Sequence, residues 1–282
     1  MPFTLSHAAA VLPAVRRDGS GRGPLVPSVL VAGSFAPDLT YFAASFVPGA
    51  MEFGAVTHSF AGVASVDVLI AWGLVALWLL VREPLVALLP RSLQGRPAAL
   101  LRCGTPLARL RATTALRWYV SAALGALTHV VWDAFTHHDR WGSHLIPALM
   151  RPAAGLPLYT WLQYGTSALA AVVLAVFLSH ALRHAPASVP YGVPILSTRD
   201  RALATGLLGG CATLAALQRM TLWWGRPHAR LLELVPTVCF GAGAGLVVGV
   251  VVYAVAVRGW RSAGGRVGAG AAGREAVGRG AR

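Results

Sequence analysis

Charged residues are scarce in this 282-residue sequence. They make up 12% of the chain, whereas apolar residues make up 56%. The sequence contains no lysine, because its 24 basic residues are all arginine, and it holds only 10 acidic residues. A soluble globular domain usually carries about 25% charged residues. These shortages exclude an ordinary soluble domain and indicate a membrane protein.

Cysteine is also rare. Of the three cysteines, Cys211 and Cys239 lie inside apolar stretches, and their spacing from Cys103 fits neither a zinc ribbon nor a redox motif. A disulfide framework is therefore excluded, and we expect the cysteines to pack among apolar neighbours.

Long apolar stretches are plentiful, and a membrane-spanning helix needs about 20 such residues. The clearest windows are Phe60 to Val81, Trp118 to Phe135, Tyr159 to Leu182, Ala202 to Leu217 and Leu234 to Val257. A sixth window, Leu25 to Val47, is interrupted by two prolines and Asp38, so it either spans the membrane or lies buried among other helices. The sequence predicts an all-α, polytopic integral membrane helical bundle with about five to six membrane helices over residues 1–257.

The net charge of +14 comes from arginines that lie mainly between the apolar windows. This distribution is typical of loops at a membrane surface, so we expect membrane lipids as partners and no specific nucleic acid. Seven arginines lie from Arg82 to Arg117, and six more follow Val257. The positive-inside tendency places both segments in the cytoplasm of a multi-pass protein of the cell membrane, and residues 136–158 outside.

Two parts of the chain complicate this arrangement. The loop 218–233 falls on the outer side although it contains Arg219, Arg226 and Arg230. Residues 258–282 are rich in Gly, Ala and Arg, and we expect a disordered basic tail near anionic headgroups.

A stripe of small residues lies in the last window, at Gly241, Gly245 and Gly249. Such a stripe permits close helix packing. It predicts either a homo-oligomer contact or packing inside the same bundle.

Polar residues in the segment THVVWDAFTHH suggest a metal site. His129, Asp133 and His137 are four residues apart and share one face of a helix, whereas His138 joins them only if the helix has ended. A histidine and a carboxylate on adjacent turns can hold a divalent ion. The alternative is a local hydrogen bond or a contact between helices.

Further ionisable residues lie in apolar surroundings near the start of the chain. His7, Asp38 and His58 each precede or open a helix, and Asp67 lies within an apolar window. Ionisable groups are costly in such places, which favours a partner and a function. We expect Asp67 to accept a hydrogen bond from a ligand histidine or to pair with an arginine.

The motifs SHAAAVLP, GSFAPDLTYF, THS and THVVWDAFTHH resemble those of the bacterial membrane protein family of domain of unknown function 4184. The resemblance covers roughly the first 145 residues by motif and the remainder by apolar pattern. More distantly, the order of these residues is similar to that of inner-membrane metal-dependent hydrolases and of the zinc phospholipase C and single-strand nuclease group.

This resemblance implies a cluster of zinc or other divalent ions. Its ligands would be His7, Asp38, His58, His129, Asp133 and His137 or His138. No later His-x3-Glu pair is present, so one or two ions are expected rather than three.

Two functions are consistent with such a cluster. A metal ion that activates water would suit a hydrolase acting on phosphate esters or lipid headgroups, with Asp139, Arg140 and His144 either lining the mouth or forming an ordinary solvated loop. The rival is a non-catalytic transporter or assembly factor in which the same residues hold helices together or relay ions.

Overall fold

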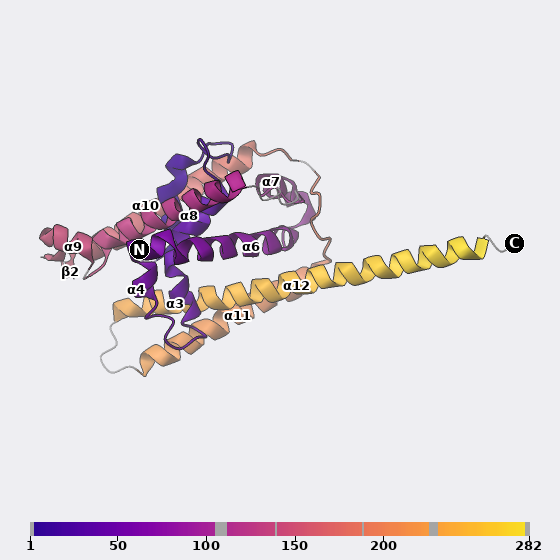
Figure 1. Cartoon of the computed structure of the whole chain (residues 1–282). Coiled ribbons are helices and arrows are strands. Elements are labelled where there is room, and N and C mark those ends of the chain that lie inside the picture. The colour runs from indigo at the N-terminus through magenta and orange to yellow at the C-terminus, as the bar shows by residue number, and fades with distance from the viewer. Residues whose placement is uncertain (1–2, 105–111, 139, 188, 226–230, 280–282) are drawn as a thin grey trace.

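The computed structural model describes residues 3–104, 112–138, 140–187, 189–225 and 231–279, with side chains up to Gly259 in the last range. The named secondary-structure elements of this part of the chain are helices, apart from one short hairpin (Figure 1). The helices are η1 (Thr4–His7), α1 (Ala8–Val11), η2 (Leu12–Ala14), α2 (Pro27–Phe35), η3 (Ala36–Asp38), α3 (Leu39–Ala43), α4 (Gly54–Thr57), α5 (Phe60–Ala64), α6 (Val66–Ala87), η4 (Arg91–Leu93), α7 (Gly95–Leu100), α8 (Ala112–Thr136), α9 (Trp141–Leu145), η5 (Pro147–Met150), α10 (Leu158–His184), α11 (Thr198–Trp224) and α12 (Leu231–Arg279). The strands β1 (Pro152–Ala153) and β2 (Leu156–Pro157) pair antiparallel.

Within the described residues, three helical segments are long and apolar enough to cross a membrane: Val66–Ala87, Leu158–His184 and Glu233–Gly259. The predicted five to six spans are therefore not confirmed. The window from Leu25 to Val47 folds as three short helices, α2, η3 and α3, because its prolines interrupt it. The windows in α8 and α11 form helices of 25 and 27 residues, but polar and charged side chains lower their apolar content.

Helices α2 and α8 approach each other closely through glycine. A Cβ atom on Gly33 would lie 2.3 Å from the Ala122 carbonyl oxygen, and one on Gly125 would lie 2.2 Å from the Leu30 carbonyl oxygen. The Ser121 hydroxyl accepts a hydrogen bond from the Val26 amide at 3.0 Å. Only glycine permits this backbone contact, which sets the position of α2, and of Asp38 just beyond it, relative to α8.

Helix α6 packs against α2 and α8 on one side and against α12 on the other. The core between α2, α6 and α8 consists of small and branched side chains, among them Val29, Ala32, Val68 and Ala71. At the far end of α6, the Glu83 carboxylate accepts hydrogen bonds from Arg82 and Arg258, each at 2.7 Å. This ion network joins α6 to α12.

The glycine stripe of α12 lies against α11 of the same chain. Cβ atoms on Gly241, Gly245 and Gly249 would all meet α11 atoms, including the Ala215 and Cys211 carbonyl oxygens. Packing within the bundle thus occupies this face, and a homo-oligomer contact through it stays a prediction.

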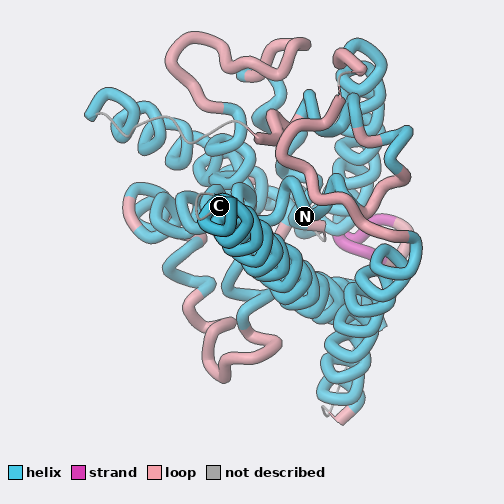
Figure 2. The backbone as a smooth tube through the Cα atoms, turned by 90° about the vertical axis from the view of Figure 1, so that its right-hand side faces the viewer, coloured by secondary structure: helices cyan, strands magenta, loops and turns pink. Residues whose placement is uncertain are grey.

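Figure 2 views α12 obliquely from its C-terminal end, and Figure 1 shows the C-terminal part of this helix extending away from the other helices. The backbone of α12 continues as a helix to Arg279 (Figure 1), through most of the predicted disordered tail. Side chains after Gly259 lie outside the described residues, and the cytoplasmic location of the tail stays a prediction.

One of the arginines that complicated the predicted topology is not a loop residue. Arg219 is buried inside α11 and donates a hydrogen bond to the Tyr41 carbonyl oxygen at 2.9 Å. Arg226 and Arg230 lie outside the described residues.

Candidate metal centre

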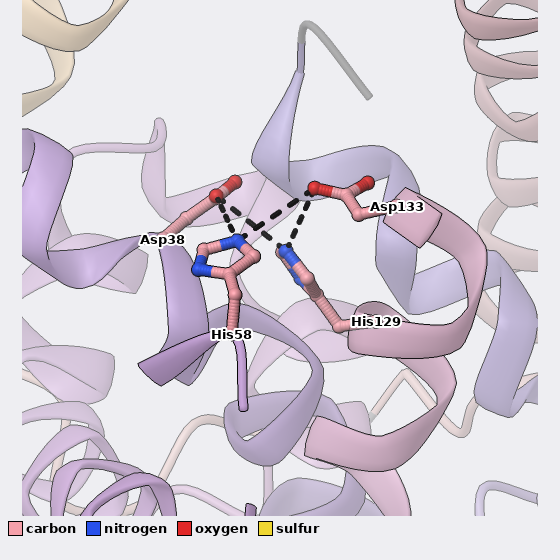
Figure 3. Close-up of side chains that lie close together, drawn as sticks. All are labelled: Asp38, His58, His129 and Asp133. Atoms are coloured by element: carbon pink, nitrogen blue, oxygen red, sulfur yellow. Dashed lines mark ion pairs between the residues drawn. The ribbon is translucent and has the colours of Figure 1, made fainter. Parts of the chain in front are cut away.

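Four side chains from three separate parts of the chain converge in the interior (Figure 3). Asp38 ends η3, His58 follows α4, and His129 and Asp133 lie on adjacent turns of α8. Each offers a ligand atom, and these atoms all lie within 4.8 Å of one another. All four residues are buried, with at most 8% of their surface exposed. The structure thus brings together four of the residues predicted as metal ligands.

The contact between α2 and α8 determines the orientation of His129. Its Nδ1 lies 2.7 Å from the Ser34 carbonyl oxygen, near the C-terminal end of α2. A carbonyl oxygen only accepts hydrogen bonds, so Nδ1 carries the proton. In the neutral ring the lone pair is therefore on Nε2, which faces Asp38 and Asp133.

A tight turn orients His58 in the same way. Its Nδ1 lies 3.0 Å from the Gly54 carbonyl oxygen, at the start of α4. The next helix, α5, begins directly after Ser59, because the Ser59 hydroxyl caps it by accepting a hydrogen bond from the Gly62 amide at 3.0 Å. The Nε2 lone pair of His58 therefore also faces both carboxylates.

The distances between these groups are too long for hydrogen bonds. Nε2 of His129 lies 3.5 Å from Asp38 Oδ1 and 3.4 Å from Asp133 Oδ2, and Nε2 of His58 lies 3.6 and 3.7 Å from the same oxygens. Charge-assisted hydrogen bonds measure about 2.7–2.9 Å. Ligands on a tetrahedral ion at about 2.0–2.2 Å stand roughly 3.3–3.6 Å apart. These four nitrogen–oxygen separations therefore fit ligands of one ion, and the remaining ligand atoms also lie within 4.8 Å of one another.

The hydrogen-bond inventory leads to the same conclusion. Among the described residues, Nε2 of His58 and Nε2 of His129 are buried without a hydrogen-bond partner. Each of these lone pairs faces two carboxylates, which are also acceptors. A cation satisfies all four groups, and two neutral imidazoles, two carboxylates and one divalent ion sum to zero charge. The donor set therefore fits a divalent metal.

The carboxylate Asp38 and the ring of His58 influence each other's protonation. Burial alone would raise the pKa of Asp38, but His129 and His58 hold it well below its ordinary value. Burial alone would lower the pKa of His58, but Asp133 and Asp38 raise it. A metal ion at this site must therefore compete with a proton on His58.

His7 lies beside the group of four. Its ring stacks on His129 with centroids 3.5 Å apart, and its Nε2 lies 3.4 Å from Asp133 Oδ1. The ring is fully buried, and neither nitrogen has a hydrogen-bond partner among the described residues. Burial and the nearby His129 lower its pKa well below the ordinary value, which favours the neutral ring.

The other two predicted histidine ligands lie further out, because α8 ends at Thr136. His137 Nδ1 is 3.5 Å from Asp133 Oδ2, while its Nε2 is 3.0 Å from Gln163 Nε2 on α10. His138 is exposed, with its ring 6.1 Å from that of Tyr159. Neither belongs to the group of four, and their role as ligands stays a prediction.

Asp67 is completely buried, and neither carboxylate oxygen has a hydrogen-bond partner among the described residues. It is close enough to His58 and His129 to interact with them electrostatically. Its predicted hydrogen bond to a ligand histidine, or its pairing with an arginine, is therefore not observed in the described part of the chain.

Several residues that support the site were not identified from the sequence. The Thr4 hydroxyl donates a hydrogen bond to Asp38 Oδ2 at 2.5 Å, and the Ser34 carbonyl oxygen accepts one from His129 Nδ1. Tyr41 lies with its ring 5.5 Å from that of His58. Thr4 lies three residues before His7, and Tyr41 three after Asp38, but nothing in the local pattern indicates contact with the site.

Comparison with curated proteins and with solved structures finds no match. A family model described as domain of unknown function (DUF4184) matches residues 1–255. The predicted resemblance to that family is therefore confirmed, whereas the more distant resemblance to hydrolases is not supported. With nearly the whole chain covered by the match, the protein belongs to the family of domain of unknown function 4184.

Proposed function

We propose that this chain is an integral membrane protein that holds one divalent metal ion between Asp38, His58, His129 and Asp133 and acts as a metal-dependent hydrolase. One observation carries the metal assignment. Two buried imidazoles, each with its proton directed to a backbone carbonyl, present lone pairs to two carboxylates at 3.4–3.7 Å.

Zinc is the ion that best suits this set of ligands. Two histidine nitrogens and two carboxylate oxygens at tetrahedral separations are a common zinc environment, and imidazole ligands disfavour magnesium and calcium. The hydrogen bonds from Thr4 to Asp38 and from His129 to Ser34 hold the ligands in place.

Hydrolysis needs water at the ion in addition to the four protein ligands. A divalent ion supplies Lewis acidity and lowers the pKa of water towards 7. His7, whose Nε2 lies 3.4 Å from Asp133 Oδ1, would accept a hydrogen bond from that water through whichever ring nitrogen carries no proton.

The proposed site lies toward the end of α8 that precedes α9, away from the arginine-rich segment that contains α7 (Figure 1). If that segment is cytoplasmic, the site is near the outer face of the membrane. A site there would be accessible to lipid headgroups.

A non-catalytic role is the alternative, and one observation favours it. The site offers four protein ligands, the number that completes the shell of a structural zinc site. In that case the role of the ion would be structural: it would hold η3, the end of α4 and helix α8 together.

Elemental analysis of the purified protein tests the metal assignment. Wild-type protein is expected to contain about one divalent ion per chain, and His129→Ala and Asp38→Ala variants far less, because each loses a ligand. Equal metal content in all three proteins would contradict the proposal. Exchange of the bound ion with added isotope separates the two roles, since a hydrolytic site is open to water and a structural one is closed.

A further inference from the structure

An apolar cavity of about 560 Å³ lies between the N-terminal half of α11 and α12. None of the metal ligands lines it. Its lining residues are mainly apolar and come from both helices: Leu203, Ala204 and Leu207 of α11, and Tyr253, Ala256 and Val257 of α12. The Tyr253 hydroxyl donates a hydrogen bond to the Pro84 carbonyl oxygen at 2.8 Å, so its ring is the part left to line the cavity. Both helical walls are therefore apolar.

The position of this cavity determines what can fill it. The wall formed by α12 belongs to Glu233–Gly259, one of the three segments that are long and apolar enough to cross a membrane. Large apolar side chains of the lining remain exposed, with Leu203 at 63% and Ile195 at 77%. Contact of such side chains with water is unfavourable, whereas contact with hydrocarbon is not. In a membrane, an apolar ligand is therefore the favoured occupant.

The size of the cavity suits a slender chain. From Asp200 to Leu207, the part of α11 that lines it, the helix rises about 10 Å. A second helix, about 10 Å or more in diameter, would need roughly 800 Å³ over that length, which exceeds the cavity. Sites for small molecules measure about 300–1,000 Å³ and combine an apolar lining with a few polar groups. A lipid acyl chain fits this description better than a partner helix does.

A guanidinium group lies at the end of the cavity where α11 begins. Arg201 Nη1 donates a hydrogen bond at 3.3 Å to the carbonyl oxygen of Leu196, a lining residue, and Nη2 donates one at 3.3 Å to Thr198 Oγ1. No carboxylate of the described residues forms an ion pair with Arg201. Since a guanidinium has five N–H donors, Arg201 retains donors for a ligand.

The charges around Arg201 favour an anion. The Asp200 carboxylate also lines the cavity, but its Oδ2 accepts hydrogen bonds from the Ser197 amide and hydroxyl at 3.1 and 2.7 Å. Two arginines, Arg199 and Arg201, accompany this one acid in the first turn of α11. Arg258, next to Val257, is paired with Glu83 and adds no net charge. A guanidinium with free donors matches the oxygens of a phosphate group, and basic sites between membrane helices bind anionic headgroups.

We propose that this cavity binds an anionic phospholipid, with an acyl chain between α11 and α12 and the headgroup phosphate on Arg201. This inference rests on the membrane location in the proposed function and on no part of the metal centre.

Native mass spectrometry of the full-length protein in detergent, titrated with phosphatidylglycerol or phosphatidylcholine, tests the proposal. The wild type is expected to bind one phosphatidylglycerol per chain, and phosphatidylcholine more weakly. Arg201→Gln should weaken phosphatidylglycerol binding about 10- to 100-fold and narrow the preference, because it removes charge-assisted hydrogen bonds to the phosphate. Arg183→Gln is the matched control, since Arg183 is an exposed arginine at the end of another candidate membrane span, and it should bind as wild type does.

A second pair of variants tests the cavity itself. Leu203→Trp places an indole ring where the acyl chain would lie and should weaken binding of both lipids about tenfold or more. Leu214→Trp is its control, because Leu214 is similarly exposed on α11, at 70%, but does not line the cavity. Both positions are exposed, so both variants should fold.

Equal lipid affinities for Leu203→Trp and Leu214→Trp would overturn the proposal. So would equal binding of the two lipids by the wild type, or an Arg201→Gln variant that binds phosphatidylglycerol as the wild type does. A protein dimer in place of a lipid-bound monomer would show that a second copy occupies this face, and would also overturn it.

Two further measurements on the same samples separate this inference from the proposed function. Metal content should be the same in the wild type and all four variants, because the cavity and the metal ligands share no residue. If the wild type remains in the membrane fraction after an alkaline wash but fails the lipid tests, this inference alone fails. If the wild type leaves the membrane fraction, the membrane location fails and the lipid site with it.

Discussion

Two buried acidic clusters in this protein differ in how their charges are satisfied. At one end of α6, both oxygens of Glu83 accept hydrogen bonds: one from Arg82 at 2.7 Å and Gly104 at 3.2 Å, the other from Arg258 at 2.7 Å. At the other cluster, Asp38 and Asp133 face imidazole nitrogens at 3.4–3.7 Å. The hydrogen bonds of Glu83 are complete within the chain, whereas Nε2 of His58 and Nε2 of His129, which face Asp38 and Asp133, have no hydrogen-bond partner among the described residues.

The difference shows that burial of an acid does not by itself indicate a metal site. The balance of hydrogen-bond donors and acceptors around the acid is the better indication. Leaving a buried polar group unpaired costs more free energy than forming a hydrogen bond gains. Arginine brings its own fixed charge to Glu83. Histidine brings charge to Asp38 and Asp133 only when it is protonated, so a metal ion between them competes with a proton.

Removing a ligand charge should give the largest effect. Asp133→Asn is expected to lower metal affinity more than about 100-fold, beyond what changes to residues supporting a ligand usually cause. Competition with a chromogenic chelator measures it. Glu83→Gln is the matched control, since it removes a similarly buried carboxylate that holds no ion.

The control should lower the melting temperature through loss of the Arg82 and Arg258 contacts while leaving metal affinity unchanged. If Glu83→Gln released the ion as readily as Asp133→Asn, the distinction between the two clusters would be lost.

Acidification should give the next largest effect. The pKa of His58 is raised by its two carboxylates, so a proton occupies its Nε2 up to a higher pH than in an ordinary histidine. The proton then displaces the ion as the pH falls. The metal affinity should decrease by up to about tenfold for each pH unit below that pKa. Metal content after dialysis at pH 8, 7 and 6 should decline stepwise, and constant content would count against His58 as a ligand.

A smaller effect is expected from Thr4→Val, which removes the hydroxyl that donates to Asp38. Loss of such a supporting hydrogen bond should lower metal affinity about tenfold. Thr40→Val is the control, because Thr40 is also buried near Asp38 but its hydroxyl is directed to the Pro37 carbonyl. Equal affinities for the two variants would mean that Thr4 does not support the ligand.

Part of the site could be predicted from the sequence by helical geometry alone. His129 and Asp133 are four residues apart, and their side chains do meet on one face of α8. That Asp38 and His58 join them was implied only by the family resemblance. Their convergence depends on the Gly33 and Gly125 contacts and on the turn at Gly54, which are long-range features that no local pattern contains.

The membrane topology was harder to predict for a related reason. An apolar window indicates burial but does not distinguish lipid from protein as the surroundings. The window Leu25 to Val47 became three short helices, of which α2 and η3 pack against α8 and α6 and α3 packs against α12. Arg219 became a buried partner of the Tyr41 carbonyl oxygen.

The most direct test is X-ray absorption spectroscopy of the purified, full-length protein at the absorption edge of its bound metal. The account predicts one ion per chain with two imidazole nitrogens and two carboxylate oxygens at about 2.0–2.2 Å, a shell that is lost in Asp133→Asn. An ion with sulfur ligands, or a wild-type protein with no bound ion, would contradict it.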